Sequence, residues 1–216
     1  MKQGFLIDPQ AVLDPMVRWT PVKEQHSEDG YNTLIPPLVH KIRLGVKAWR
    51  ESGYVGVSET SRALLRHWFE TDHACHGVDG LYNFRYYFAQ REAVESVIWL
   101  YEVEEAHDPY TMLKYDGSRR VSQGMFAQDW TRYVMKLATG SGKTKVMSLL
   151  IAWSYFHKRY EERSDLSTNF LLIAPNIIVL ERLRKDFDKL AIFHDDPVVP
   201  ENGYEGPWLR IHGFPR

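Results

Sequence analysis

The stretch Ala138-Thr-Gly-Ser-Gly-Lys-Thr144 decides how the rest of this 216-residue chain is interpreted. Its two glycines let backbone N–H groups turn inward around an anion, because glycine adopts angles that other residues avoid. The lysine supplies a mobile cation for the β- and γ-phosphates, and the threonine supplies a hydroxyl for Mg²⁺. We therefore expect a phosphate-binding loop for ATP and Mg²⁺. Its expected nucleotide-binding residues are Thr139, Gly140, Ser141, Gly142, Lys143 and Thr144, with Lys143 and Thr144 as catalytic groups and Thr144 as the metal ligand.

The segments on either side of the loop support this interpretation. Residues 132–137 carry the β-branched and aromatic side chains of a short strand. Residues 143–159 follow with apolar side chains at helical spacing and end on two cations, as a helix dipole prefers. The general pattern has glycine five residues before Gly142, and this chain has Leu137 there. The alternative is a glycine turn that precedes Lys-Thr by chance.

Composition sets the broad class of the protein. Hydrophobic residues make up 44% and charged residues 25%, which is typical of a globular protein. The formal net charge of −1 gives no general signature of nucleic-acid binding, so any basic surface has to be local. A single cysteine, Cys75, excludes an internal disulfide and suits a reducing compartment. With no apolar run long enough to span a bilayer, we expect a cytoplasmic protein with no membrane association.

The sequence before the loop predicts a mainly helical region. Residues 1–36 are rich in proline and look irregular. Two helices are expected at 38–51 and 58–70, followed by a polar loop at 71–80. A third, longer helix is expected at 82–102. The polar, turn-rich segment 107–129 predicts a hairpin or a surface insertion.

The sequence after the loop predicts alternating strands and helices. Residues 170–174, Phe-Leu-Leu-Ile-Ala, form a continuous apolar run, as expected of a strand buried on both faces. Pro175 ends the run, and Asn176 is placed to cap a helix. Strand, helix, strand and helix in this order predict an α/β fold with a parallel sheet. The apolar stripe of the second helix would consist of Leu180, Leu183, Phe187 and Leu190.

Three segments together resemble a known family. They are 88–95 (Phe-Ala-Gln-Arg-Glu-Ala-Val-Glu), the loop 137–144, and 171–176 (Leu-Leu-Ile-Ala-Pro-Asn). Their order resembles the first three motifs of superfamily 2 helicases and translocases, and within these the ATP-dependent (Res) subunit of type III restriction endonucleases. The resemblance implies a partial RecA-like motor domain over 81–216, preceded by a helical extension over 1–80.

The resemblance also implies roles for particular residues and for partners. Gln90 would hydrogen-bond the adenine edge, because an amide offers a donor and an acceptor together; the alternative is a polar residue on a helix surface. Pro175 and Asn176 would touch a nucleic-acid backbone, and the alternative for Asn176 is a plain helix cap. The whole protein would couple ATP hydrolysis to movement along double-stranded DNA, assisted by a modification methyltransferase or other defence subunits. Whether it also cleaves DNA stays open.

One expected feature is absent from the sequence. ATP hydrolysis in this class uses an acidic pair after a strand, and no Asp-Glu dipeptide occurs in the chain. The nearest candidate, Asp195-Asp196, leaves no room for a preceding strand. We therefore expect a fragment that ends before the acidic motif and is inactive alone. Two alternatives stay open, a P-loop nucleotide kinase-like transferase and an inert nucleotide-binding or interaction module.

Overall fold

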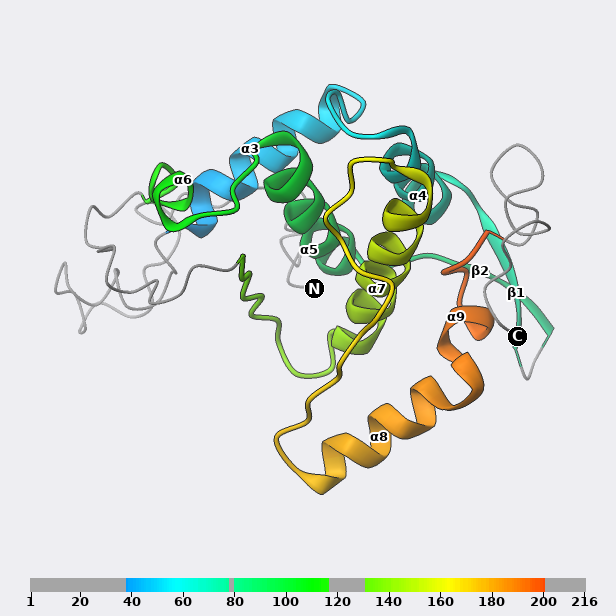
Figure 1. Cartoon of the computed structure of the whole chain (residues 1–216). Coiled ribbons are helices and arrows are strands. Elements are labelled where there is room, and N and C mark those ends of the chain that lie inside the picture. The colour runs from blue at the N-terminus through cyan, green and yellow to red at the C-terminus, as the bar shows by residue number, and fades with distance from the viewer. Residues whose placement is uncertain (1–37, 78–79, 117–130, 201–216) are drawn as a thin grey trace, which may run out of the picture. The chain divides into compact units, whose positions relative to one another are not determined.

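The computed structural model describes residues 38–77, 80–116 and 131–200. They contain helices and one small sheet (Figure 1). The predicted irregularity of 1–36 lies outside the described residues. The described strands are β1 (His73–Gly77) and β2 (Gly80–Phe84), and the helices are α3 (Val39–Glu51), α4 (Glu59–Glu70), α5 (Phe88–Ile98), α6 (Pro109–Leu113), α7 (Lys143–Tyr160), α8 (Ile177–Phe187) and α9 (Ile192–Asp195), with a π-helical turn η1 (Trp99–Val103) and a 3-10 turn η3 (Asp188–Leu190).

The chain divides into two compact units. The first holds residues up to 56 together with 95–135, and the second holds 57–94 together with the residues from 136 onward. The division cuts the chain differently from the expected boundary at residue 80, so the domain assignment stays a prediction. α5 contributes its first seven residues to the second unit and its remainder to the first.

The core of the first unit is aromatic. α3 begins and ends where the sequence predicts a helix, and its buried face carries Val46 and Trp49. Gly45 lies so close to the Trp99 ring that an added Cβ would sit 2.4 Å from Cη2 of that ring. The absence of a side chain at Gly45 therefore allows the indole to pack directly on α3. Ile98 and Leu100 are buried beside it.

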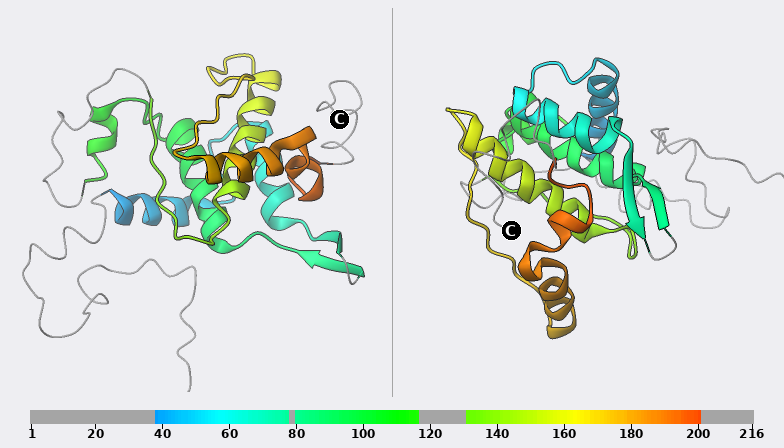
Figure 2. Two further views of the ribbon diagram at one scale, coloured as in Figure 1. Left: turned by 90° about the horizontal axis from the view of Figure 1, so that it is seen from below. Right: turned by 90° about the vertical axis from the view of Figure 1, so that its right-hand side faces the viewer.

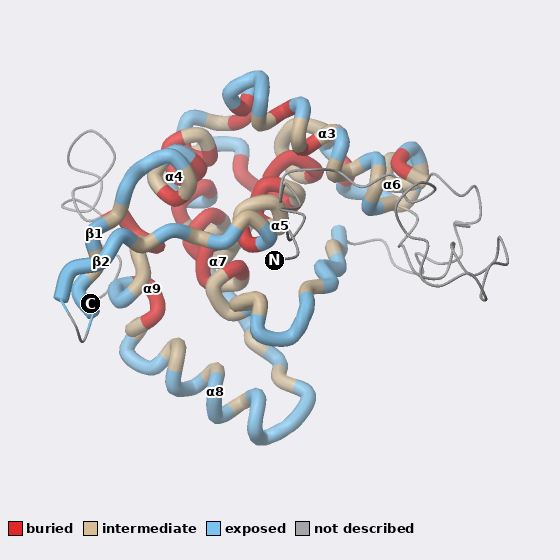
Figure 3. The backbone as a smooth tube through the Cα atoms, turned by 180° about the vertical axis from the view of Figure 1, so that it is seen from behind, coloured by how far each residue is buried: buried red, intermediate tan, exposed pale blue. Residues whose placement is uncertain are grey.

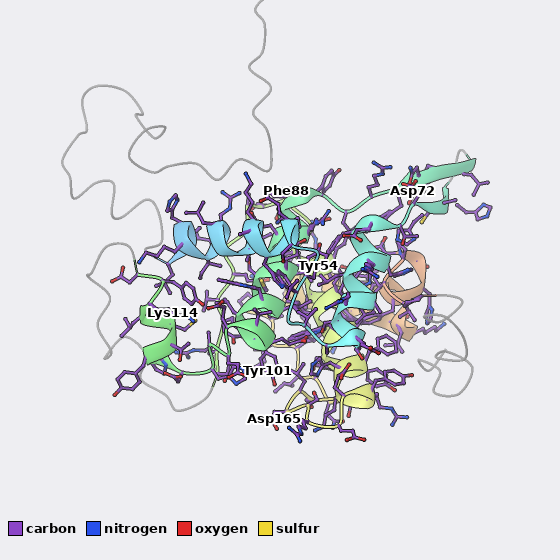
Figure 4. The ribbon with its side chains drawn as sticks, turned by 90° about the horizontal axis from the view of Figure 1, so that it is seen from above. Tyr54, Asp72, Phe88, Tyr101, Lys114 and Asp165 are labelled. Atoms are coloured by element: carbon purple, nitrogen blue, oxygen red, sulfur yellow. The ribbon has the colours of Figure 1, made fainter. Side chains whose placement is uncertain are left out.

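A buried ion pair also joins α3 to α5 within this unit. The Arg50 guanidinium donates to both carboxylate oxygens of Glu95, at 2.5–3.0 Å, and Glu95 is fully buried. The Tyr54 hydroxyl donates to the same carboxylate at 2.6 Å (Figure 4). A buried charge is tolerated only when it is paired and hydrogen-bonded, and here three donor contacts come from Arg50 and one from Tyr54.

Two long helices build the second unit. α4 and α7 pack together, and both begin where the sequence predicts them (Figure 2). Ser58 caps α4 by accepting a hydrogen bond from the Ser61 backbone N–H. Inside the interface, Trp153 Nε1 donates to Ser61 Oγ at 2.7 Å. The buried residues of the two helices include Leu64, Leu65, Trp68, Leu149 and Phe156. Parts of α4 and α7 are accordingly red in Figure 3.

The expected loop at 71–80 and the start of the expected third helix are wrong. β1 and β2 pair as an antiparallel hairpin, with His73 opposite Phe84 and Gly77 opposite Gly80. At the base of the hairpin an exposed ion pair joins Arg85 to Asp72, which Figure 4 labels. α5 starts only at Phe88. The hairpin escaped sequence analysis because its strands are exposed and lack the alternation of apolar and polar side chains that marks a half-buried strand.

The parallel sheet expected from the sequence is not seen in the described residues, where β1 and β2 form the only sheet. Residues 132–137 and 170–174 are not assigned as strands. Leu171 and Ile173 are each 83% exposed. An apolar strand gains its stability from neighbouring strands and from covered faces, and neither run has them here.

The region after 174 is helical, as predicted, but the apolar stripe of α8 is only half-buried. α8 contains no buried residue and is mostly pale blue in Figure 3. α9 was not expected, because the predicted helix ended at Leu190 and no element was predicted for 191–194. The prolines and glycines of 195–216 predicted a loop. Ile192 and Phe193 of α9 are buried, and Trp68 Nε1 donates to the Val198 carbonyl at 2.7 Å, so long-range packing orders this segment. The part of the loop prediction from 201 onward lies outside the described residues.

The predicted insertion at 107–129 contains a short helix. α6 starts after Asp108, whose carboxylate accepts hydrogen bonds from the N–H groups of Tyr110 and Thr111. Residues 117–130 lie outside the described residues. None of the helices within 38–77, 80–116 and 131–200 is both long and apolar enough to cross a membrane.

Candidate nucleotide-binding site

The loop at 138–144 forms a tight turn at the start of α7. Gly140 has φ of +81° and Gly142 has φ of +77°, in the left-handed region that favours glycine. Ser141 closes the turn, because its backbone N–H and its hydroxyl both donate to the Ala138 carbonyl, at 3.3 and 2.8 Å. This backbone shape can direct successive N–H groups toward an anion, as the sequence predicts.

The start of α7 adds to this preference for an anion. Gly142 is the N-cap and no side chain caps the helix there. The first turn carries no acidic residue, and Lys143 is its first residue. The first N–H groups of a helix have no partner within the helix, and the dipole makes that end positive. A phosphate group would accept hydrogen bonds from these N–H groups and would be attracted to the positive end of the helix.

Lys143 folds back over the turn. Its ammonium group donates to the carbonyls of Leu137 and Ala138, at 3.0 and 2.8 Å. The side chain is exposed, and the carbonyls hold the cation beside the loop. A phosphate oxygen offers a stronger, charged acceptor at the same place, so Lys143 can exchange carbonyl partners for phosphate.

The donor set fits a nucleotide phosphate with Mg²⁺. Thr139 and Gly140 are exposed, and a Cβ added at Gly140 would meet nothing within 4 Å, so the outer side of the turn is open. Thr144, at the second position of α7, offers the hydroxyl that the sequence assigns to Mg²⁺. The described residues hold no group of three or more His, Cys, Asp or Glu side chains that could bind a metal by themselves. A metal here would depend on Thr144 and the phosphates.

The structure brings Gln90 to the loop. Its carboxamide nitrogen donates to the Ser141 carbonyl at 2.9 Å, and its carboxamide oxygen accepts from the Tyr87 N–H at 2.9 Å. The Gln90 side chain is 2% exposed, so it is not the surface helix residue of the alternative interpretation. A contact between Gln90 and adenine stays a prediction.

Asn176 and Pro175 lie at the start of a different helix. The Asn176 carboxamide oxygen accepts a hydrogen bond from the Val179 N–H at 3.0 Å and so caps α8. Both residues are exposed. The structure thus shows the helix cap, whereas the expected contact with a nucleic-acid backbone stays a prediction.

Two residues beside the loop were not expected there from the sequence. Lys145, in the first turn of α7, forms an ion pair with Asp196 and lies over the Phe84 ring at 5.0 Å. Burial first, and the negative charge of Asp196 second, raise the pKa of the neighbouring Tyr86 hydroxyl far above its ordinary value. No local pattern connects positions 145 and 196, so only the fold could show this contact.

Comparison with known proteins gives one match. The family model for the type III restriction enzyme, res subunit, matches residues 82–205, more than half of the chain. The matched range contains Gln90, the loop, Pro175 and Asn176. No curated protein and no solved structure matches the chain.

Proposed function

Because this chain belongs to the family of type III restriction enzyme Res subunits, we propose that it binds ATP with Mg²⁺ at the loop 138–144. The observation that carries the proposal is the pair of left-handed glycines around Ser141 at the uncapped start of α7, with the Lys143 ammonium held beside them. Family membership supports a helicase-like ATP-binding protein. The proposal adds the residues and their roles.

Each residue of the loop has a defined task in this proposal. The N–H groups of the turn and of the first turn of α7 bind the β- and γ-phosphates. Lys143 leaves the carbonyls of Leu137 and Ala138 and neutralises charge that develops on the γ-phosphate. The Thr144 hydroxyl would hold Mg²⁺, which would neutralise phosphate charge when bound. The base is adenine, as the family resemblance implies for a chain with Gln90 in this position.

The proposed fold around this site is RecA-like. Residues 132–137 and 170–174 would be parallel strands of one sheet, with α7 as the connecting helix. Two observations support this assignment: the family match, and the apolar exposure of Leu171 and Ile173, which further strands would bury. Cross-strand nuclear Overhauser effects that place each run in a parallel ladder test it.

The proposed activity of the complete protein is movement along double-stranded DNA, driven by ATP hydrolysis, with modification or other defence subunits as partners. Pro175 and Asn176 would touch the DNA backbone at the start of α8. The exposed cations Arg182, Arg184 and Lys185 lie on the same helix and are accessible to phosphates. Charge reversal of Arg184 should weaken DNA binding and reduce its dependence on salt, whereas Lys158→Glu on α7 should not.

The decisive experiment removes the Lys143 ammonium. In the complete protein, DNA-stimulated ATP hydrolysis should fall by about a hundredfold or more in Lys143→Ala, because one preorganised charge at the transferring phosphate is lost. Lys136→Ala, an exposed cation just before the loop, is the matched control and should keep the wild-type rate. An unchanged rate in Lys143→Ala contradicts the proposal. Phosphoryl transfer from ATP to a small acceptor would instead support a kinase-like transferase.

A further inference from the structure

The ion pair between Lys145 and Asp196 brings a carboxylate to the first turn of α7. The Asp196 side chain is 13% exposed, so water screens this pair only in part. The first turn carries no acidic residue of its own, and the negative charge comes from a segment 51 residues later in the sequence. A carboxylate and a phosphate are both charged acceptors for an ammonium group, so a phosphate bound nearby would compete with Asp196 for Lys145.

The Lys145 side chain runs along the phosphate-binding loop. Its Cδ lies 3.8 Å from the position of a Cβ built on Gly142. Its ammonium lies over the Phe84 ring, 5.0 Å from the ring centre, and the side chain is 35% exposed. The ammonium is two bonds beyond Cδ, on a flexible stem. It can therefore turn from Asp196 toward a phosphate held at the start of α7.

The Tyr86 hydroxyl is a second donor beside Asp196. It is buried and has no hydrogen-bond partner among the described residues. Burial first, and the charge of Asp196 second, raise the pKa of this hydroxyl, so it keeps its proton close to the carboxylate. A buried hydroxyl without a partner costs free energy, and a hydrogen bond to Asp196 would remove that cost. If Lys145 left the carboxylate, Tyr86 could replace it as the donor.

We infer that Asp196 is a positioning residue that holds the Lys145 ammonium away from the phosphate-binding loop until a polyphosphate displaces it. On binding, the ammonium turns to the phosphates, and the Tyr86 hydroxyl donates to Asp196 in its place. The ion pair is thus an autoinhibitory contact that lowers the affinity of the loop for polyphosphates. This inference rests on the proposed function and adds a regulation of the same site, acting on the phosphates and independent of the base.

The inference predicts tighter binding when the carboxylate is neutralised. Asp196→Asn no longer holds the ammonium, so titration calorimetry at fixed ionic strength should show about fivefold tighter binding of ATP, GTP and inorganic tripolyphosphate. All three ligands should gain alike, because the exchange involves phosphates only. Asp195→Asn removes the same charge at the exposed neighbouring position, so it controls for long-range electrostatics and should bind like the wild type.

Further variants test the two donors separately. In a Lys145→Met protein, the added change Asp196→Asn should act no more strongly than Asp195→Asn, since no ammonium is left to release. Tyr86→Phe removes the replacement donor and should weaken binding of all three ligands by about threefold. Tyr87→Phe, at a side chain that is 73% exposed, is its control and should bind like the wild type. Far-UV circular dichroism checks that each variant is folded.

The outcomes separate this inference from the proposed function. Equal affinities in the wild type and Asp196→Asn would overturn the inference and leave the proposed ATP site intact. An equal gain in Asp195→Asn would assign the effect to general charge and would also overturn it, and wild-type affinity in Tyr86→Phe would overturn the exchange of donors. If neither the wild type nor Asp196→Asn binds any of the three ligands, the proposed function fails and the inference fails with it.

Discussion

Lys145 and Asp196 form an ion pair across 51 residues of sequence, in the first turn of α7 and directly after α9. The carboxylate side chain is 13% exposed and the ammonium side chain 35%. The pair fixes the segment 192–199 beside the helix that begins at the phosphate-binding loop. The same segment is held at its far end by the hydrogen bond from Trp68 to Val198.

Removing this ion pair should loosen the segment at one end. We expect Asp196→Asn to lower the free energy of unfolding by about 1 kcal/mol, because the pair is only partly buried and solvent screens part of its attraction. Urea unfolding followed by tryptophan fluorescence measures the change. Asp195→Asn, at an exposed position one residue earlier, should be neutral. Equal losses in both variants would show that the ion pair with Lys145 has no special role.

Breaking the buried ion pair of the first unit should be far more costly. Glu95 is fully buried and the Arg50 side chain is 10% exposed, so Arg50→Met leaves a carboxylate with only part of its donors. The expected loss is about 3–5 kcal/mol of unfolding free energy. Arg85→Ala removes a pair whose side chains are 73% and 75% exposed, so it should change the unfolding free energy little. Similar losses in the two variants would contradict this ranking.

The two loop glycines should differ in their tolerance of alanine. Both have positive φ, which costs an alanine about 1–2 kcal/mol. A Cβ at Gly140 meets nothing within 4 Å, whereas one at Gly142 collides with Gln90. We therefore expect Gly142→Ala to lose more stability than Gly140→Ala, as measured by thermal unfolding. Adding Gln90→Ala to Gly142→Ala should recover part of the difference, and no recovery would mean that the collision is relieved in another way.

His67 should make the fold sensitive to acid. Burial, and next the neighbouring His73, lower the pKa of His67 from 6.5 to about 4. The folded protein keeps this imidazole neutral while the unfolded chain protonates it, so the unfolded state binds more protons between these values. The stability that this neutral imidazole contributes is complete above about pH 6.5 and is lost as the pH falls toward 4, by about 3 kcal/mol in all.

Urea unfolding at pH 7 and pH 5 tests the role of His67. His67→Gln should lose less stability between the two pH values than the wild type does. His76→Gln, at an exposed strand position, should behave like the wild type. The same pH dependence in all three proteins would exclude His67 as its source.

The helices at α3, α4 and α7 could be predicted almost to the residue, since each has local signals. Ser58 caps the start of α4, and Gly142 occupies the N-cap position of α7. The apolar residues of all three helices recur at helical spacing. The hairpin β1–β2 could not be predicted, because its exposed strands leave no apolar alternation. A helix starting at 82 was expected because Phe84 and Tyr87 fit helical spacing, but Phe84 pairs with His73 in the hairpin.

At the candidate site, the sequence by itself determined the loop: glycine, lysine and threonine within a few residues fix the backbone angles and the donor groups that an anion needs. The spacing Tyr87-x-x-Gln90 contained a further local signal, since a glutamine at the third helical position can bond back to the N–H that precedes the helix. Only the tertiary structure decided that the other end of this amide meets Ser141, and that Asp196 meets Lys145. Such contacts depend on how distant segments pack, and packing is a property of the whole chain that no short stretch of sequence contains.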